Sequence, residues 1–268
     1  MAELGARGLR FHVQRLGAPA EGARPRVVFL HGLVMDNLSS FYFTLANPMA
    51  AVAEVLLYDL RGHGKSDRPR TGYGLSEMLA DLEALLDQVW PASPSYFVGN
   101  SFGGLLGLAF AAKHPERTAG LALIDGHLGE SGWADRMAAT LELQGEERDR
   151  RIAESFASWL GRHSERKSTR LARTAASLVY ETTLVADMRA SPRLDADALS
   201  RVRCPVLALY GADSDLRAEA ESIAARLSRC ELRVVSGATH SVLWEATARV
   251  REDVVGWVRD RARAGEGG

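Results

Sequence analysis

A serine stands between two glycines in the segment Gly99-Asn100-Ser101-Phe102-Gly103. The segment follows a short apolar run and precedes a run whose spacing fits a helix. In a strand–turn–helix of this form the serine occupies a tight, strained turn that small neighbouring residues permit. The first N–H groups of the helix can donate to a negatively charged oxygen. The pattern therefore predicts that Ser101 is a nucleophile for acyl chemistry.

A serine hydroxyl is a weak nucleophile until a base takes its proton, and histidine titrates in the right range. His240 is the predicted base, because it follows the last predicted strand and a glycine-containing loop. The base needs a carboxylate to orient it. The loop after the apolar run at 205–210 offers Asp213 and Asp215, and Asp125 ends the preceding apolar run. The residue types alone do not decide which of these three acids orients His240.

Short apolar runs separated by helical patterns indicate the elements that must position these side chains. The runs are apolar on both faces, as buried parallel strands are. Strand–helix alternation of this kind predicts an α/β domain with a mostly parallel sheet flanked by helices. The expected strands are 26–30, 55–59, 95–99, 120–125, 205–210 and 231–235, and the expected helices are 75–86, 102–114, 219–227 and 243–261.

One long segment, residues 127–203, contains no convincing strand and has the spacing of several helices. It is too long for a simple connection between two strands. We expect an inserted helical cap over the carboxyl edge of the sheet, where α/β folds bind their ligands. The core would then comprise residues 1–126 and 204–268.

Composition narrows the class of protein. The chain has 268 residues, of which 46% are hydrophobic and 25% charged, with a formal net charge of −1. These values are typical of a globular domain, and the charge balance argues against nucleic-acid binding.

The sequence has no apolar stretch of membrane-spanning length and no signal peptide, so we expect a cytoplasmic protein without a membrane partner. Two cysteines, Cys204 and Cys230, predict neither a disulfide framework nor a metal site, and no motif indicates a cofactor. The excess of arginine over lysine favours a bacterial source.

Four motifs in order resemble those of the α/β-hydrolase superfamily, over nearly the whole chain. His31-Gly32 is similar to the oxyanion-loop signature, and residues 59–66 (DLRGHGKS) resemble the D-x-R-G-x-G-x-S turn. Gly99 to Gly103 matches the nucleophile elbow, and residues 237–240 (GATH) resemble the segment that carries the catalytic histidine. The resemblance implies the α/β-hydrolase fold and the order serine, acid, histidine along the chain.

The resemblance also implies particular roles. The family commonly places its acid three residues after the glycine that ends the strand, and here that position is Ser214. A variant subgroup with this pattern puts the acid at Asp215, which we favour, with Asp213 capping the next helix. Asp125 is a weaker choice. The oxyanion donors are expected to be the backbone N–H groups of Phe102 and Leu33.

The expected reaction is hydrolysis of a small or medium hydrophobic carbonyl compound: an ester, lactone, thioester or carbon–carbon bond. The GNSFGG elbow resembles that of meta-cleavage-product hydrolases and related esterases, whereas an aspartate there would suggest an epoxide hydrolase. A place in secondary metabolism or aromatic degradation is expected. Two alternative functions are not excluded: an acyltransferase or cyclase, and a ligand-binding member of the fold without turnover. The oligomeric state is not predicted. Expected substrate-binding residues are Val34, Met35, Asn37, Trp133, Phe156, Trp159 and Trp244.

Overall fold

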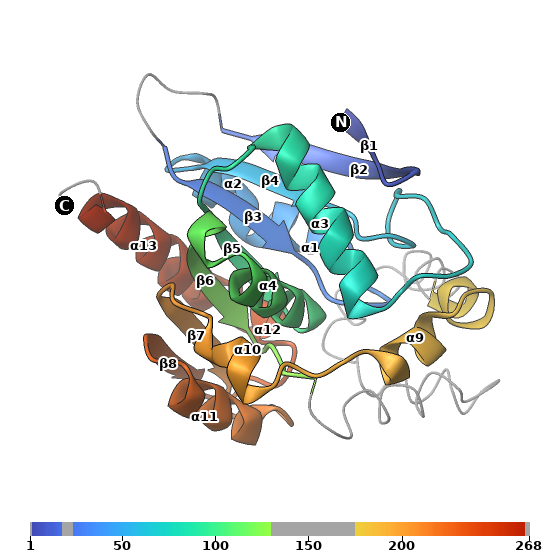
Figure 1. Cartoon of the computed structure of the whole chain (residues 1–268). Helices are drawn as coiled ribbons and strands as arrows, with labels where there is room; N and C mark the ends of the chain where they lie inside the picture. Colours follow the sequence, from blue (N-terminus) through green and yellow to red (C-terminus); the bar gives the residue numbers. More distant parts are fainter. Residues whose placement is uncertain (1, 18–23, 130–174, 266–268) are drawn as a thin grey trace.

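An eight-stranded sheet runs through the centre of the computed structural model, which describes residues 2–17, 24–129 and 175–265 (Figure 1). The strand order is β1-β2-β4-β3-β5-β6-β7-β8. All neighbours from β4 to β8 pair in parallel. The mostly parallel sheet predicted from the apolar runs is confirmed. The strands are β1 (Ala2–Ala6), β2 (Leu9–Leu16), β3 (Arg26–Leu30), β4 (Glu54–Tyr58), β5 (Ser95–Asn100), β6 (Thr118–Ile124), β7 (Val206–Gly211) and β8 (Cys230–Val235).

The two strands β1 and β2 were not expected from the sequence. They form an antiparallel hairpin whose turn, Arg7-Gly8, has positive φ at both residues, and β2 also pairs antiparallel with β4. A two-residue turn of this kind matches the twist of the flanking strands. Polar and arginine residues interrupt the apolar pattern of both strands, so periodicity alone gives a weak signal there.

Helices cover both faces of the sheet. One face carries α3 (Leu75–Val89), α4 (Phe102–Lys113), α10 (Ala196–Ser200) and α11 (Arg217–Arg226). The other carries α1 (Ser39–Phe41), the π-helical turn η1 (Tyr42–Ala46), α2 (Asn47–Ala50), α12 (Val242–Glu245) and α13 (Thr247–Gly265). The 3₁₀ turn η2 (Pro115–Arg117) joins α4 to β6, and α9 (Leu184–Ala190) precedes α10. The helix expected at 243–261 is divided at Ala246, the residue between α12 and α13.

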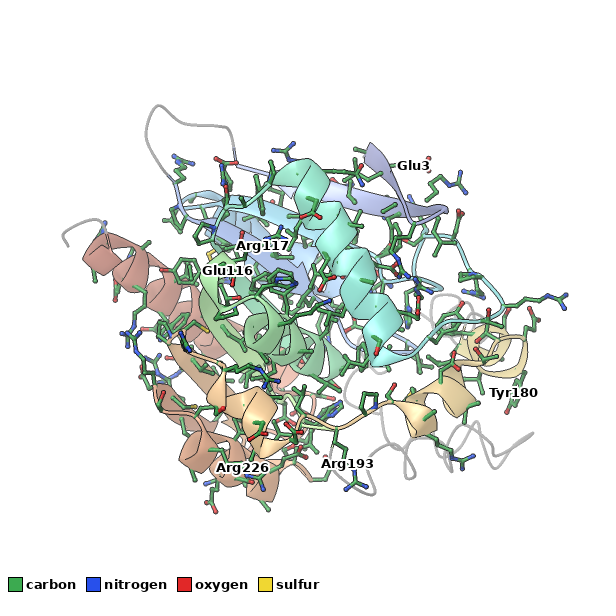
Figure 2. All side chains as sticks on the ribbon, in the orientation of Figure 1. Glu3, Glu116, Arg117, Tyr180, Arg193 and Arg226 are labelled. Carbon is green, nitrogen blue, oxygen red and sulfur yellow. The ribbon has the colours of Figure 1, made fainter. Side chains whose placement is uncertain are left out.

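Alternation along each strand explains the two apolar layers. In β3, Val28 and Leu30 belong to the buried cluster on the α3–α4 side, and Val27 and Phe29 belong to the cluster on the α13 side. Successive side chains of a strand point to opposite faces, so a strand that is apolar throughout needs helices on both. Charged side chains such as Glu3, Arg193 and Arg226 lie at the periphery (Figure 2).

The predicted cap is described only at residues 127–129 and 175–203. Residues 130–174 lie outside the described ranges, so the cap boundaries of 127–203 stay a prediction. Of the described remainder, α10 packs against α4 and belongs to the core cluster. In the described ranges, no helix combines the length and the apolar character that crossing a membrane requires.

Candidate active site

The turn between β5 and α4 holds Ser101 in a conformation that few side chains adopt. Its φ is 52° and its ψ is −117°, so the residue has positive φ without being glycine. A Cβ on Gly99 would lie 2.3 Å from the carbonyl oxygen of Gly103, and one on Gly103 would lie 1.9 Å from that of Leu30. Both glycines are therefore required by contact distances, and they let the sharp turn form between strand and helix.

His240 lies between the serine and a buried carboxylate. Its Nε2 is 3.2 Å from Ser101 Oγ, and its Nδ1 is 2.6 Å from Asp125 Oδ2. Ser101 directly follows β5, Asp125 directly follows β6, and His240 lies in the loop after β8. Such a row of hydrogen bonds lets the imidazole accept the serine proton while the carboxylate holds the ring and its tautomer.

The structure corrects the expectation that Asp215 orients His240. Asp215 is exposed and has no hydrogen bond to the ring, while the fully buried Asp125 does. Asp125 directly follows β6, which pairs with β7, so the loops after both strands reach the same edge of the sheet. Asp213 is not a helix cap either, because α11 has Leu216 at its N-cap position without a side-chain hydrogen bond.

Three donors hold the Asp125 carboxylate. Oδ1 accepts the N–H of Gly211 at 3.0 Å, and Oδ2 accepts the hydroxyl of Ser214 at 2.5 Å as well as the histidine. Ser214 occupies the position at which the resemblance led us to look for an acid. Its hydroxyl instead helps to satisfy a carboxylate that arrives from the neighbouring strand, which a buried charge requires.

The loop that carries His240 is held close to the end of β7. A Cβ on Gly211 would lie 2.2 Å from the carbonyl oxygen of Ala238, so glycine permits this approach. Glu245 accepts hydrogen bonds from the N–H and the hydroxyl of Thr239, the residue before the histidine. These contacts fix the backbone from which the imidazole projects.

The charges around His240 favour its protonated form. Burial lowers the pKa of the imidazole, but the hydrogen bond and charge of Asp125, with the charges of Asp215 and Glu245, raise the pKa above its ordinary value of 6.5. His127, which is fully buried, behaves in the opposite way: burial and the nearby His240 lower its pKa to about 3. Asp215 has no hydrogen bond to His240 and raises the pKa of the imidazole through its charge.

The loop of residues 31–35, called the oxyanion loop below, passes beside the serine. A Cβ on Gly32 would lie 3.6 Å from Ser101 Cβ. The Gly32 N–H donates to Asp36 Oδ2 at 2.9 Å, and the Leu33 carbonyl accepts from Met35 N–H at 2.9 Å. Within the described ranges the Leu33 N–H has no protein acceptor, and neither has that of Phe102, the residue after the serine.

The remaining expected substrate-binding residues have different surroundings. Val34 and Met35 are buried in the apolar cluster on the α3–α4 side. Asn37 accepts the N–H of Ser39 with its side-chain oxygen, which forms an Asx turn. Trp244 is partly buried and packs against both apolar clusters. Trp133, Phe156 and Trp159 lie outside the described residues.

Asp36 is not among the residues predicted from the sequence, yet its carboxylate accepts the Gly32 N–H beside the serine. Its position four residues after that glycine is the only sequence signal. In the described part of the chain, no group of three or more His, Cys, Asp and Glu side chains is placed to hold a metal ion.

Comparison with known proteins identifies the family of the chain. The profile of the alpha/beta hydrolase family matches residues 27–253. The chain belongs to this family. Among curated relatives, a cis-3-alkyl-4-alkyloxetan-2-one decarboxylase of Shewanella oneidensis is 32% identical over 108 residues, which cover 39% of this chain and 33% of the relative. The chain thus spans about a third of the length of that relative.

Solved structures share the fold over almost the whole chain. An enol-lactonase from Burkholderia xenovorans LB400 has a TM-score of 0.74 at 21% identity, covering 96% of this chain and 99% of the other. A meta-cleavage product hydrolase from Pseudomonas fluorescens IP01 has a TM-score of 0.81 at 17% identity, covering 97% and 98%. The α/β-hydrolase architecture expected from the four motifs is therefore confirmed.

Proposed function

We propose that this α/β-hydrolase family member is a serine hydrolase in which Ser101 is the nucleophile, His240 the base and Asp125 the orienting acid. The observation that carries the proposal is the continuous row of hydrogen bonds from Asp125 through His240 to Ser101, at 2.6 and 3.2 Å. The strained φ of 52° at the serine supports it, because a fold keeps such a conformation where function needs it.

In the first half of the reaction, Ser101 Oγ attacks the substrate carbonyl carbon and its proton passes to His240 Nε2. The carbonyl oxygen becomes an oxyanion, for which the N–H groups of Phe102 and Leu33 are the proposed donors. Each such donor contributes roughly 3 kcal/mol to the stability of the transition state. The protonated imidazole then gives its proton to the leaving group, and an acyl-enzyme forms.

In the second half, a water molecule attacks the acyl-enzyme and His240 takes one of its protons. The second tetrahedral intermediate collapses, the acid product leaves, and the proton returns to Ser101 Oγ. Asp125 stays ionised throughout and stabilises the imidazolium that forms twice in the cycle. Its burial supports this role, because a charge in low dielectric interacts strongly with its neighbour.

The proposed substrates are small or medium hydrophobic carbonyl compounds. The buried Val34 and Met35 on the oxyanion loop support an apolar acyl site. The names of two similar proteins specify lactones: an oxetan-2-one is a four-membered cyclic ester, and the other protein is an enol-lactonase. Esters and lactones are therefore the first compounds to test. Trp133, Phe156, Trp159 and Trp244 stay proposed contacts of the substrate.

A fluorophosphonate probe tests the nucleophile directly, because only an activated hydroxyl attacks phosphorus quickly. Intact-protein mass spectrometry should show one adduct on the wild type, none on Ser101→Ala, and one on the control Ser200→Ala, which changes an exposed serine. The wild type and Ser200→Ala should hydrolyse p-nitrophenyl butyrate, and Ser101→Ala should not. Labelling or hydrolysis that survives Ser101→Ala would disprove the assignment.

A further inference from the structure

The peptide group that carries the Leu33 N–H is held through its own carbonyl and through the peptide group that follows it. The Gly32 carbonyl accepts from His31 Nδ1 at 2.6 Å, and the next carbonyl, that of Leu33, accepts from Met35 N–H. The next N–H, that of Val34, donates to His63 Nε2 at 2.8 Å. The Leu33 N–H is thus flanked by groups with fixed partners.

Val34 needs this outside contact because its own conformation is unfavourable. Its φ is 68°, a region that β-branched residues rarely adopt. The residue is also 95% buried, so its N–H would be an unsatisfied donor without the histidine. A buried N–H that loses its acceptor costs about 1–3 kcal/mol. The His63 contact therefore stabilises the turn of the chain directly after Leu33.

The tautomer of His63 is set by its second contact. Nδ1 lies 2.8 Å from the carbonyl oxygen of Arg61, so this nitrogen carries the proton and Nε2 keeps its lone pair for Val34. Burial, together with the nearby His31, lowers the pKa of His63 to about 3, so the ring stays neutral under assay conditions. A protonated ring would turn a second donor toward the Val34 N–H.

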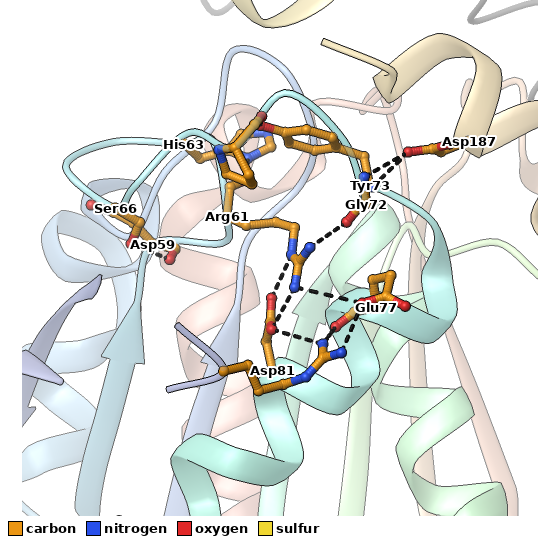
Figure 3. A network of polar contacts seen from close by, with 11 residues as sticks. Asp59, Arg61, His63, Ser66, Gly72, Tyr73, Glu77, Asp81 and Asp187 are labelled. Carbon is orange, nitrogen blue, oxygen red and sulfur yellow. Dashed lines mark hydrogen bonds and ion pairs between the residues drawn. The ribbon is translucent and has the colours of Figure 1, made fainter. Parts of the chain in front are cut away.

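The turn that carries His63 is itself rigid. The Arg61 guanidinium binds both carboxylate oxygens of Asp81 at 2.6 Å, and Arg61 also donates to the carbonyl oxygen of Gly72 (Figure 3). Asp59 accepts the N–H of Lys65 at the other end of the turn. His63 thus joins the oxyanion loop to a turn that these hydrogen bonds hold in place.

We propose that His63 is a positioning residue that fixes the oxyanion loop through the Val34 N–H and so aims the Leu33 N–H at the developing oxyanion. The proposal rests on the proposed function, because it assigns a role to His63 in that reaction. His63 is buried, with 1% of its surface exposed, so the proposal gives it no contact with the substrate. Its loss should lower kcat and leave KM nearly unchanged, since the oxyanion exists only in the transition state.

Two polar substitutions separate this role from a general role in folding. In His63→Gln the side-chain oxygen can take the place of Nε2 and accept the Val34 N–H. In His63→Asn the shorter amide reaches only the place of Nδ1. We expect kcat for p-nitrophenyl butyrate to fall less than about 5-fold in the glutamine variant and roughly 10- to 100-fold in the asparagine variant, below the loss of a whole oxyanion donor. His114→Gln, which changes a histidine bound to Glu83 at the opposite end of α4 from Ser101, is the matched control.

A thionoester gives a readout that a folding defect alone would not change. Sulfur is a poor acceptor for oxyanion donors, so the wild type should hydrolyse the oxygen ester much faster than the thiono analogue. This preference should fall about 10-fold or more in His63→Asn and persist in His63→Gln and His114→Gln. Thermal unfolding checks that the variants are folded at the assay temperature.

The outcomes separate the two proposals. If the wild type hydrolyses the ester, Ser101→Ala does not, and His63→Asn keeps the full oxygen-ester preference, the role of His63 is disproved and the serine mechanism stands. If Ser101→Ala hydrolyses the ester at the wild-type rate, the serine mechanism is wrong and the role of His63 falls with it. Equal losses of preference in His63→Gln and His63→Asn would also overturn the proposal.

Discussion

Replacement of Asp125 by asparagine tests the acid at the level of single atoms. The asparagine oxygen can accept the Gly211 N–H as Oδ1 does now, at 3.0 Å. Its NH₂ group would then replace Oδ2 and face the N–H of His240 Nδ1, where the structure has a contact of 2.6 Å. Two donors cannot share this contact, so the imidazole must carry its proton on Nε2 instead. That nitrogen could no longer accept the proton of Ser101.

The wrong tautomer should cost roughly 10⁴-fold in kcat, as in other serine triads. This loss corresponds to about 5.4 kcal/mol of transition-state stabilisation. The fold should survive, because the Ser214 hydroxyl can rotate and accept from the new NH₂ group at the place where it now donates to Oδ2. The melting temperature should therefore fall by a few degrees at most.

Asp215→Asn is the matched control for this experiment. It removes one carboxylate charge at the same edge of the sheet, but from an exposed side chain without a hydrogen bond to His240. Its kcat at high pH should stay within about 3-fold of the wild type, as for a partly screened charge. Steady-state hydrolysis of p-nitrophenyl butyrate by both variants decides the matter. An Asp125→Asn variant within 10-fold of the wild type, or an inactive and folded Asp215→Asn variant, would refute the reasoning.

Three further predictions concern the base, the elbow and the loop before α3. Because the pKa of His240 is raised and only neutral imidazole is a base, kcat/KM should rise with pH through an inflection above pH 6.5. Asp215→Asn should move this inflection to lower pH, since it removes one of the charges that raise the pKa of His240. An inflection below pH 6 in the wild type would contradict the charge argument. Gly103→Ala should unfold the protein or cost several kcal/mol in urea denaturation, since the new Cβ would overlap a carbonyl oxygen; wild-type stability would show that the turn adapts. Asp187→Ala should cost about 1–3 kcal/mol, because two N–H groups at residues 72 and 73 lose their acceptor (Figure 3); an unchanged melting temperature would show that water replaces it.

Local sequence determined the strands of the parallel sheet and the elbow. Residues 27–30 (VVFL) are apolar at every position, a pattern typical of a strand that is covered on both faces. Gly99 is a local requirement, because a Cβ there would lie 2.3 Å from the carbonyl oxygen of Gly103. Gly103 is required by a neighbouring strand, since its Cβ would lie 1.9 Å from the carbonyl oxygen of Leu30. The partnership of Ser101 with His240 was predicted from two motifs 139 residues apart, and the structure brings the two side chains together.

The identity of the acid was decided by tertiary structure. Asp125 and Asp215 follow adjacent parallel strands, so both are delivered to the same edge, and sequence order cannot choose between them. Distance and burial choose: Asp125 is enclosed by Gly211, Ser214 and the imidazole, while Asp215 faces solvent. The contact between His63 and Val34 likewise joins residues 29 positions apart. Such contacts depend on how two loops meet above the sheet, and no local pattern in the sequence encodes that meeting.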